Sequence, residues 1–426
     1  MQPRPRLRNS HGNCPTNRGR NRGNTELAFS TREDTLVVAR SLLPALRERT
    51  GRCATDRSLA SETLDDLRRA GLLRVATPPS LGGFGLGIDV GLEIAMELAR
   101  GCSSTGWVFG QFIIHNWNAA RLDSAAREAY FSKPDIACAT AIAMLTCEIQ
   151  DAPGGLLVNG RWRLSSGIDH ADWLWIMTFP SERYGGALIP AGDFALIDDW
   201  DVIGLSGTGS KEVYLQEVFV PTERLIERGW EQTFLGGGDP FYEEDPTYGV
   251  APSVWGPWAS SCLIGTGRAM IDVFESGTIN RKDSVTGRRC AEDPLIHVVI
   301  AESSAEVDCA ANLFYHDMAE LRRVAESGNE IDLDVVFEVA RNSAYACRLL
   351  LRSGQRLYEH FGSSVIYDNN LLRQLFGDIL TGTRHAIFSW EYNAEQYGRT
   401  RFGLGPLSIR GTSPKPPTRQ PPKMPR

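Results

Sequence analysis

The hydrophobic pattern of this chain changes its period twice, and this change limits the fold more than any single motif does. Apolar side chains recur at helical spacing over residues 31–121, and residues 136–225 break into short β-rich runs. Helical spacing returns at Ala251 and continues to Tyr397. The order helix, strand, helix predicts an α+β protein in which a β region separates two helical regions.

Several helix boundaries can be placed from their end signals. Thr31-Arg-Glu-Asp34 has the form of a capping box, so a helix is expected to begin there, and Pro44 is expected to kink or split it. A second helix is predicted to begin at Ser61 and to end at Gly71. Further helices are predicted over residues 88–100, 103–121, 251–276, 294–327, 332–361 and 371–397. The last four are long enough to pack as a four-helix bundle.

Residues 155–173 form the most informative β segment. Asn159-Gly160 lies between alternating apolar residues and predicts a two-residue type I′ turn, because both central positions of that turn need positive φ. Ser165-Ser166-Gly167 then places two small hydroxyls beside a bare backbone, where a flat ligand can approach closely. Strands are predicted over residues 136–142, 156–158, 161–164, 173–179, 194–197 and 212–220.

Charge and cysteine usage exclude several classes of protein. The formal net charge of −7 argues against a nucleic-acid-binding protein. No apolar run reaches the roughly 18 residues that a membrane span needs, and the start lacks the apolar region of a signal peptide. The nine cysteines form no CxxC pair, which favours free thiols over disulfides or a zinc site. A cytoplasmic protein without a metal is therefore expected.

Both ends of the chain have compositions that bury too little apolar surface to fold. Residues 1–28 are expected to form a disordered basic tail, with a nucleic-acid-binding arm or a transit peptide as the alternatives. Residues 405–426 are rich in proline and are expected to form a second disordered tail.

Two segments outside the β region carry side chains that suit a binding site. Trp107 and His115 are eight residues apart in one predicted helix, so they lie on broadly the same side, roughly 12 Å apart along the axis. The residues alone favour a structural role for His115, as a hydrogen-bonded core histidine. Trp255 and Trp258, with Tyr242 and Tyr248, are candidates for aromatic walls, although core packing explains them equally well.

Two further motifs leave alternatives open. Gly204-Leu-Ser-Gly-Thr-Gly-Ser-Lys211 combines glycines, hydroxyls and a cation, so it is either a phosphate cradle of backbone amides or a tight turn before an edge strand. Asp169-His170 is either a structural hydrogen bond or a catalytic dyad.

Taken together, these segments resemble the acyl-CoA dehydrogenase fold over residues 31–404. The resemblance rests on the glycine-rich run after Gly71, on Arg163–Gly167 with Ala171-Asp172-Trp173, and on the Gly204–Lys211 loop with Val218-Phe-Val-Pro221. The helix around Trp107, and Tyr367–Asp378 followed by Thr383-Arg-His385, are closer to one branch of that fold. This branch comprises the oxygenase components of two-component flavin-dependent aromatic monooxygenases, such as 4-hydroxyphenylacetate and steroid-phenol hydroxylases.

The resemblance implies a domain layout and an assembly. It implies an N-terminal helical domain over residues 29–134, a central β-barrel-like domain over 135–248 and a C-terminal four-helix-bundle domain over 249–404. The assembly implied is a homotetramer built through the bundle.

The resemblance also implies an activity and a set of site residues. Reduced flavin and O₂ would form a C4a-hydroperoxyflavin that hydroxylates a phenolic or heteroaromatic substrate. The catalytic residues implied are His385, His115 and Ser166, with His385 taking the phenolic proton. The flavin-binding residues implied are Trp107, Ser165, Ser166, Gly167, Gly207, Thr208 and Ser210. The substrate-binding residues implied are His115, His385 and Trp255.

Two motifs of true acyl-CoA dehydrogenases are missing. Their Tyr-Glu-Gly-Thr motif supplies a glutamate base, whereas this chain reads Leu380-Thr-Gly-Thr-Arg-His385 near that position. Their Arg-x-x-Phe-Gly segment, which helps to hold FAD, is not evident either. Both gaps favour a diffusible cofactor, reduced FMN or FADH₂, supplied by a separate NAD(P)H:flavin reductase. An acyl-CoA dehydrogenase or oxidase with bound FAD, an N- or S-oxygenase and a non-catalytic member of the fold are the alternatives. A carboxylate-bearing substrate would need a cation, for which Arg268 is the nearest candidate.

Overall fold

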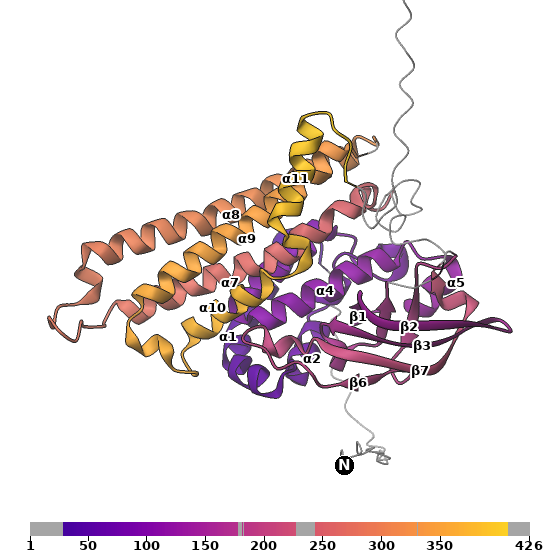
Figure 1. Ribbon diagram of the computed structural model, residues 1–426, viewed down its shortest axis with the longest axis horizontal. Helices are drawn as coiled ribbons and strands as arrows, with labels where there is room; N and C mark the ends of the chain where they lie inside the picture. Colours follow the sequence, from indigo (N-terminus) through magenta and orange to yellow (C-terminus); the bar gives the residue numbers. More distant parts are fainter. Residues whose placement is uncertain (1–28, 178–180, 182, 227–242, 330, 408–426) are drawn as a thin grey trace, which may run out of the picture.

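The computed structural model describes residues 29–177, 181, 183–226, 243–329 and 331–407. The predicted basic tail, most of the proline-rich tail and Tyr242 lie outside the described residues. An elongated bundle of C-terminal helices projects from a half that contains the N-terminal helices and the strands (Figure 1). No helix in the described ranges is both long enough and apolar enough to cross a membrane.

The N-terminal helices begin and end close to where their signals predict. Helix α1 starts at its capping box, in which Thr31 and Asp34 bond each other's backbone N–H, and it continues through Pro44 without a break. Helix α2 ends before Gly71, which has a φ of 67°. Helix α5 was not predicted. The helices are α1 (Arg32–Asp56), α2 (Ser61–Arg69), α3 (Ile88–Gly101), α4 (Ser103–Ala119) and α5 (Ser124–Tyr130).

The described residues of the β region form two four-stranded sheets. One sheet has the order β1-β4-β5-β8, with β1 and β4 parallel, and the other has the order β2-β3-β7-β6 and is antiparallel. Apolar side chains from both sheets, among them Val158, Trp162 and Leu174, form a common core. The strands are β1 (Cys138–Ala141), β2 (Ala143–Ala152), β3 (Gly155–Ser165), β4 (Trp173–Ile176), β5 (Gly186–Pro190), β6 (Ala195–Ile197), β7 (Lys211–Pro221) and β8 (Leu225–Ile226).

The predicted turn at Asn159-Gly160 is wrong, because β3 runs straight through both residues. The hairpin turn instead follows Ala152, which pairs with Gly155, and Gly154 supplies the positive φ of 80°. A Cβ on Gly160 would lie 2.5 Å from the ring of Trp162, so close packing explains this glycine. Asn159 accepts the N–H of Glu217 at 2.8 Å, where the pairing with β7 is irregular.

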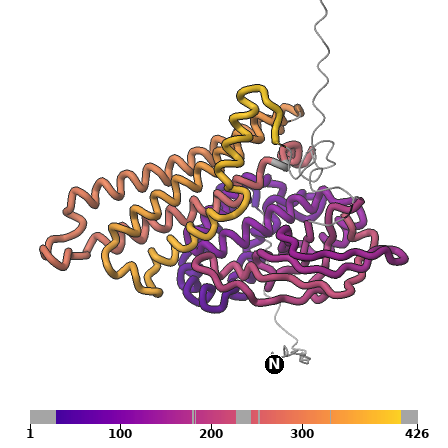
Figure 2. The backbone as a smooth tube through the Cα atoms, in the orientation of Figure 1, coloured from indigo at the N-terminus to yellow at the C-terminus, as the bar shows by residue number. Residues whose placement is uncertain are grey.

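The C-terminal helices pack lengthwise, and Figure 2 shows their backbones side by side. The predicted helix over 371–397 is wrong in one respect, because it is broken into α10 and α11. The break places His385 in extended backbone, with φ −57° and ψ 135°, ahead of a short 3₁₀ turn. The helices are α7 (Trp255–Thr278), α8 (Pro294–Glu326), α9 (Leu333–His360), α10 (Leu371–Gly382) and α11 (Trp390–Arg401).

Helix α4 lies between the strands and the bundle, where it packs against β1 on one side and α7 on the other (Figure 1). Every residue of α4 is buried, its polar side chains included. Helix α10 reaches the loop before β7, and a Cβ on Gly204 would lie 2.0 Å from the carbonyl oxygen of Gly377. The α4 side chains, the end of β3 and the α10–α11 break are thereby brought together. The predicted domain limits at residues 134, 248 and 404 stay predictions.

Candidate active site

Three hydroxyl groups join the end of β3 to the loop before β7. The Ser166 Oγ accepts the indole N–H of Trp107 at 3.2 Å and lies 2.8 Å from the Ser210 Oγ. The Ser210 Oγ lies 2.7 Å from the Thr208 Oγ1, which donates to the carbonyl of Leu205 at 2.7 Å. Ser166, Ser210 and Thr208, called here the hydroxyl network, are all buried.

Local backbone geometry sets the position of Ser166. The pairing of β3 with β7 shifts between Trp162 and Ser165, and Gly167 has a φ of 74°. A Cβ on Gly167 would lie 2.7 Å from side-chain atoms of both Phe112 and Val108 on α4, so this position requires glycine. The Gly167 N–H donates to the carbonyl of Thr208 at 2.8 Å and ties the strand end to the loop.

The groups that suggested a phosphate cradle are already paired. The N–H of Leu205 donates to the buried carboxyl of Asp378 on α10 at 2.5 Å, and Lys211 Nζ contacts both carboxylate oxygens of Asp169 at 2.8 and 2.9 Å. Gly207 packs against α1 and α4, since a Cβ there would lie 2.9 Å from the Cβ of Cys53. The loop therefore offers hydroxyls to a ligand more readily than amides or a cation.

Asp169 and His170 do not act on each other as a dyad. Asp169 is paired with Lys211, whereas the His170 Nε2–H donates to the carbonyl of Leu59 at 2.9 Å and lies 3.1 Å from the Ser58 Oγ. The structural alternative for this pair agrees with the geometry.

A cluster of indole and imidazole rings lies directly beside the hydroxyl network. Trp107 contacts Trp258 and His385, with ring centroids 5.2 and 6.0 Å apart. His115 contacts Trp255 and Trp175 at 5.5 and 5.9 Å, and Trp255 contacts Trp258 at 6.2 Å. The ring cluster consists of Trp107, His115, Trp175, Trp255, Trp258 and His385.

The two imidazoles of the ring cluster present opposite hydrogen-bonding groups. The His115 Nδ1–H donates to the carbonyl of Gln111 at 2.6 Å, so its Nε2 is an acceptor, and Nε2 has no partner within the described chain. The His385 Nδ1 accepts the N–H of Ile387 at 3.3 Å, so the proton of the neutral ring is on Nε2. Burial lowers the pKa of each imidazole to about 4, and both rings are neutral at pH 7.

The structure brings most of the predicted site residues into one place. Trp107, His115, Ser166 and His385 are joined through ring contacts and the indole hydrogen bond, and Trp255 belongs to the same cluster. Of the other proposed aromatic walls, Trp258 is in the cluster, whereas Tyr248 stacks on Trp117 at 4.7 Å.

Sequence reasoning assigned no role to Trp175 or Asp378. Trp175 lies on the predicted strand that became β4, but its alternation could not show that it would meet His115. Arg268, the candidate cation, contacts Met96 Sδ at 3.2 Å.

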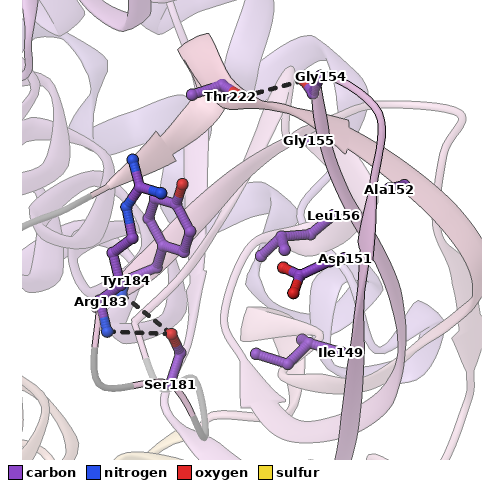
Figure 3. Close-up of a pocket in the computed structure, with 10 residues that line it drawn as sticks. All are labelled: Ile149, Asp151, Ala152, Gly154, Gly155, Leu156, Ser181, Arg183, Tyr184 and Thr222. Carbon is purple, nitrogen blue, oxygen red and sulfur yellow. Dashed lines mark hydrogen bonds between the residues drawn. The ribbon is translucent and has the colours of Figure 1, made fainter.

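A separate pocket of about 470 Å³ opens near the β2–β3 turn, and Figure 3 shows ten of its lining residues. Its wall includes Asp151, Ser181 and Arg183, with the Arg183 guanidinium 4.8 Å from the ring centroid of Tyr184. None of the predicted site residues lines it. This pocket is therefore distinct from the candidate active site at the other end of β3.

Comparison with known proteins shows which fold and which proteins this chain resembles. Residues 258–390 match the family model of the acyl-CoA dehydrogenase C-terminal domain. The crystal structure of the 3-HSA hydroxylase from Rhodococcus sp. RHA1 has a TM-score of 0.78 and 27% identity, covering 88% of this chain and 98% of that one. The protein therefore has the acyl-CoA dehydrogenase fold, as predicted.

Curated relatives narrow the class further. The oxygenase subunit HsaA of a flavin-dependent monooxygenase from Rhodococcus jostii is 28% identical over 376 residues, covering 85% of this chain and 97% of the relative. The oxygenase component of an FADH₂-dependent resorcinol hydroxylase from Rhizobium sp. is also 28% identical, covering 80% and 87%. Within the fold, this chain is similar over most of its length to oxygenase subunits and components of flavin-dependent monooxygenases.

The residues at the end of β3 fit a flavin. The Ser165 Oγ is buried and has no hydrogen-bond partner in the described ranges, and the adjacent hydroxyl network offers further polar atoms to the heteroatoms of a ring. The indole of Trp107 provides an apolar face beside them. Polar atoms at one edge and aromatic rings around them are what a planar heterocycle requires.

Proposed function

We propose that this protein takes reduced flavin from a separate NAD(P)H:flavin reductase and hydroxylates an uncharged phenol or a related aromatic ring with O₂. The observation that carries the proposal is the position of Trp107. Its indole N–H donates to Ser166 in the hydroxyl network, while its ring contacts Trp258 and His385 in the ring cluster. Flavin and substrate would therefore meet at this one side chain.

The hydroxyl network would hold the polar edge of the flavin. Ser166 is the residue proposed to face N5, with Ser165 supplying a second hydroxyl on the neighbouring backbone position. Thr208 and Ser210 hold Ser166 in place, and Gly167 allows the strand end to approach α4. Bound reduced flavin would supply the two electrons that activate O₂, of which one oxygen atom goes to the substrate and the other leaves as water.

The two imidazoles would each form a hydrogen bond with the substrate hydroxyl, one as acceptor and the other as donor. The Nε2 of His115 accepts the hydroxyl proton, and the Nε2–H of His385 donates to the hydroxyl oxygen. With a pKa of about 4, His115 does not deprotonate a phenol in the ground state. It takes the proton once oxygen transfer makes the ring hydroxyl strongly acidic. The predicted role of His385 as the base stays a prediction, and the bond to its Nδ1 favours an orienting role.

The composition of the ring cluster favours binding of an uncharged substrate. Burial lowers the pKa of both imidazoles, a backbone hydrogen bond opposes this shift at His115, and no charged side chain contributes to either shift. Four indoles and two neutral imidazoles offer no counter-ion to a carboxylate. Burying an unpaired carboxylate costs several kcal/mol, so a substrate bearing one would bind poorly here.

The same rings would keep water away from the reacting atoms. Trp107, Trp175 and Trp258 are at most 5% exposed, and His115 is completely buried. Excluding water limits the wasteful release of hydrogen peroxide from the flavin.

We also propose the assembly and the location that the resemblance implies. A homotetramer would form through helices α7–α10, and light scattering on the purified protein measures its mass directly. A cytoplasmic location is supported by the eight cysteines of the described chain, all of which are free thiols.

Anaerobic titration of the purified protein with chemically reduced FMN, and separately with reduced FAD, tests the proposal and shows which flavin is preferred. Mixing the complex with oxygenated buffer and a phenol should then yield the catechol without added reductase. Protein purified with tightly bound FAD that oxidises an acyl-CoA thioester would contradict the proposal and support a dehydrogenase.

A further inference from the structure

The hydrogen bonds that run from Trp107 to Leu205 take a single direction when the Thr208 hydroxyl donates to the carbonyl of Leu205. An indole N–H can only donate, and a backbone carbonyl can only accept. Trp107 donates to the Ser166 Oγ at one end, and the carbonyl of Leu205 accepts from the Thr208 Oγ1 at the other. The two contacts between these ends join Ser166 to Ser210 at 2.8 Å and Ser210 to Thr208 at 2.7 Å.

Each hydroxyl has one proton, so the directions follow in turn. Thr208 gives its proton to Leu205 and must accept from Ser210. Ser210 has then used its proton and must accept from Ser166. Ser166 therefore points its only proton away from any ligand, accepts from Trp107 with one lone pair and keeps one lone pair free. Ser166, Ser210 and Thr208 are 7%, 4% and 2% exposed, so water competes weakly with this arrangement.

We propose that Ser210 and Thr208 are positioning residues that make Ser166 purely an acceptor toward the flavin, and that this polarity selects the reduced cofactor. The inference rests on the proposed function, in which Ser166 faces N5. The N5 atom of reduced flavin carries a hydrogen and can donate to Ser166. The N5 atom of oxidised flavin presents a lone pair, which would meet the lone pair of Ser166 without a proton between them. The same mismatch would favour the release of oxidised flavin after turnover.

The neighbouring serine does not have this constraint. The Oγ of Ser165 is buried and has no partner in the described part of the chain, so its proton is free to turn toward a ligand or away from it. Ser165 can bond either redox state of a flavin. Discrimination between the states therefore depends on the direction imposed on Ser166 by Ser210 and Thr208.

The test measures dissociation constants for oxidised flavin and, anaerobically, for reduced flavin, in wild type and in three full-length variants. Ser210→Ala removes the group that accepts from Ser166, and Thr208→Val removes the group that accepts from Ser210. Thr208→Ser keeps a hydroxyl at position 208 and is the matched control. Circular dichroism melting checks that each variant is folded.

The decisive quantity is the ratio of the two dissociation constants, oxidised over reduced. Ser210→Ala and Thr208→Val should lower this ratio roughly tenfold, because Ser166 can then donate to bare N5. The same change appears as a fall of about 30 mV in the reduction potential of bound flavin, because a tenfold change in the ratio corresponds to about 30 mV for a two-electron couple. Thr208→Ser should keep the wild-type ratio. A general loss of structure would weaken both redox states together and leave the ratio unchanged.

Two results overturn the inference. The first is a ratio that stays within twofold of wild type in both Ser210→Ala and Thr208→Val. The second is a Thr208→Ser protein that behaves like Thr208→Val. Either result leaves the proposed function standing if wild type binds reduced flavin, whereas a wild type that binds no reduced flavin contradicts the proposed function itself.

Discussion

The hydroxyl network and the ring cluster meet at Trp107 but satisfy their polar atoms in different ways. In the network, each hydroxyl proton is bonded within the protein, from Ser166 through Ser210 to Thr208. In the cluster, the His115 Nε2 and the Trp258 Nε1 are buried without a partner among the described residues. One region is complete before a ligand arrives, and the other gains hydrogen bonds from a ligand.

This difference assigns the two regions different tasks. A closed network fixes the direction of one acceptor and suits a cofactor that binds in one redox state. Unpaired buried groups are costly, and they persist where a ligand repays them. The ring cluster is therefore the region in which substrate choice and proton transfer are expected to reside, and substitutions in the two regions should have different consequences.

The largest effect is expected from removing the acceptor in the ring cluster. His115→Phe keeps the ring volume but loses Nε2, so hydroxylation should slow on the order of 100-fold. The measurement is the rate of product formation in a single turnover with reduced flavin. His115→Gln retains a side-chain acceptor and should keep more of the rate. A His115→Phe enzyme with nearly the wild-type rate would remove the distinction between the two regions.

On the network side, Ser166→Ala should change the use of oxygen more than the binding of substrate. It removes the acceptor of Trp107 and the donor to Ser210, so the share of O₂ released as hydrogen peroxide should rise severalfold. Peroxide and product are quantified in the same reaction. Ser165→Ala breaks no hydrogen bond within the described chain and should cause a smaller rise. Equal effects of the two substitutions would count against the network.

Two substrates that differ only in charge test the ring cluster separately from the hydroxyl network. The isosteric pair 4-hydroxyphenylacetamide and 4-hydroxyphenylacetate differs in one negative charge, and the amide should bind at least roughly fivefold more tightly to the complex with reduced flavin. Anaerobic equilibrium dialysis measures both affinities. Tighter binding of the carboxylate would reveal a cation that the described residues do not supply.

The smallest effect concerns the link between α10 and the loop of the network. Burial raises the pKa of Asp378 to about 7 from an ordinary value of 3.8, so the folded protein holds a proton there that the unfolded chain releases. Stability from this group is present at low pH and is lost as the pH rises toward and past 7. Between pH 6 and pH 8 the loss should be about 1 kcal/mol. Asp378→Asn, which can still accept from Leu205, should show a flatter dependence in denaturant unfolding, and an unchanged slope would contradict the assignment.

The order of helices and strands could be predicted from the sequence because the helical and strand periods are local signals. The capping box at Thr31 and the glycine after α2 were placed correctly for the same reason. The turn predicted at Asn159-Gly160 was wrong because its motif is also local, whereas the approach of the Thr146 carbonyl of β2 to Gly160 arises only in the folded sheet. The break at His385 was missed because the surrounding residues read as one amphipathic helix.

For the site, the residues could be predicted from the sequence, but most of their contacts could not. Its histidines, Trp107 and the serine pair were found through motifs, but their mutual contacts depend on how α4, β3 and the α10–α11 break meet. The contact of Trp175 with His115 and the bond from Leu205 to Asp378 have no sequence signature. The direction of the hydrogen bonds in the network requires atomic positions and could not be inferred from residue types.

The most direct test of the central claim is a single turnover with chemically reduced flavin, a phenol and ¹⁸O₂, followed by mass spectrometry of the product. A monooxygenase should place one ¹⁸O atom in the catechol, with no label taken from H₂¹⁸O in the converse experiment. An unlabelled product, or oxygen recovered wholly as hydrogen peroxide at every phenol tested, would contradict the account.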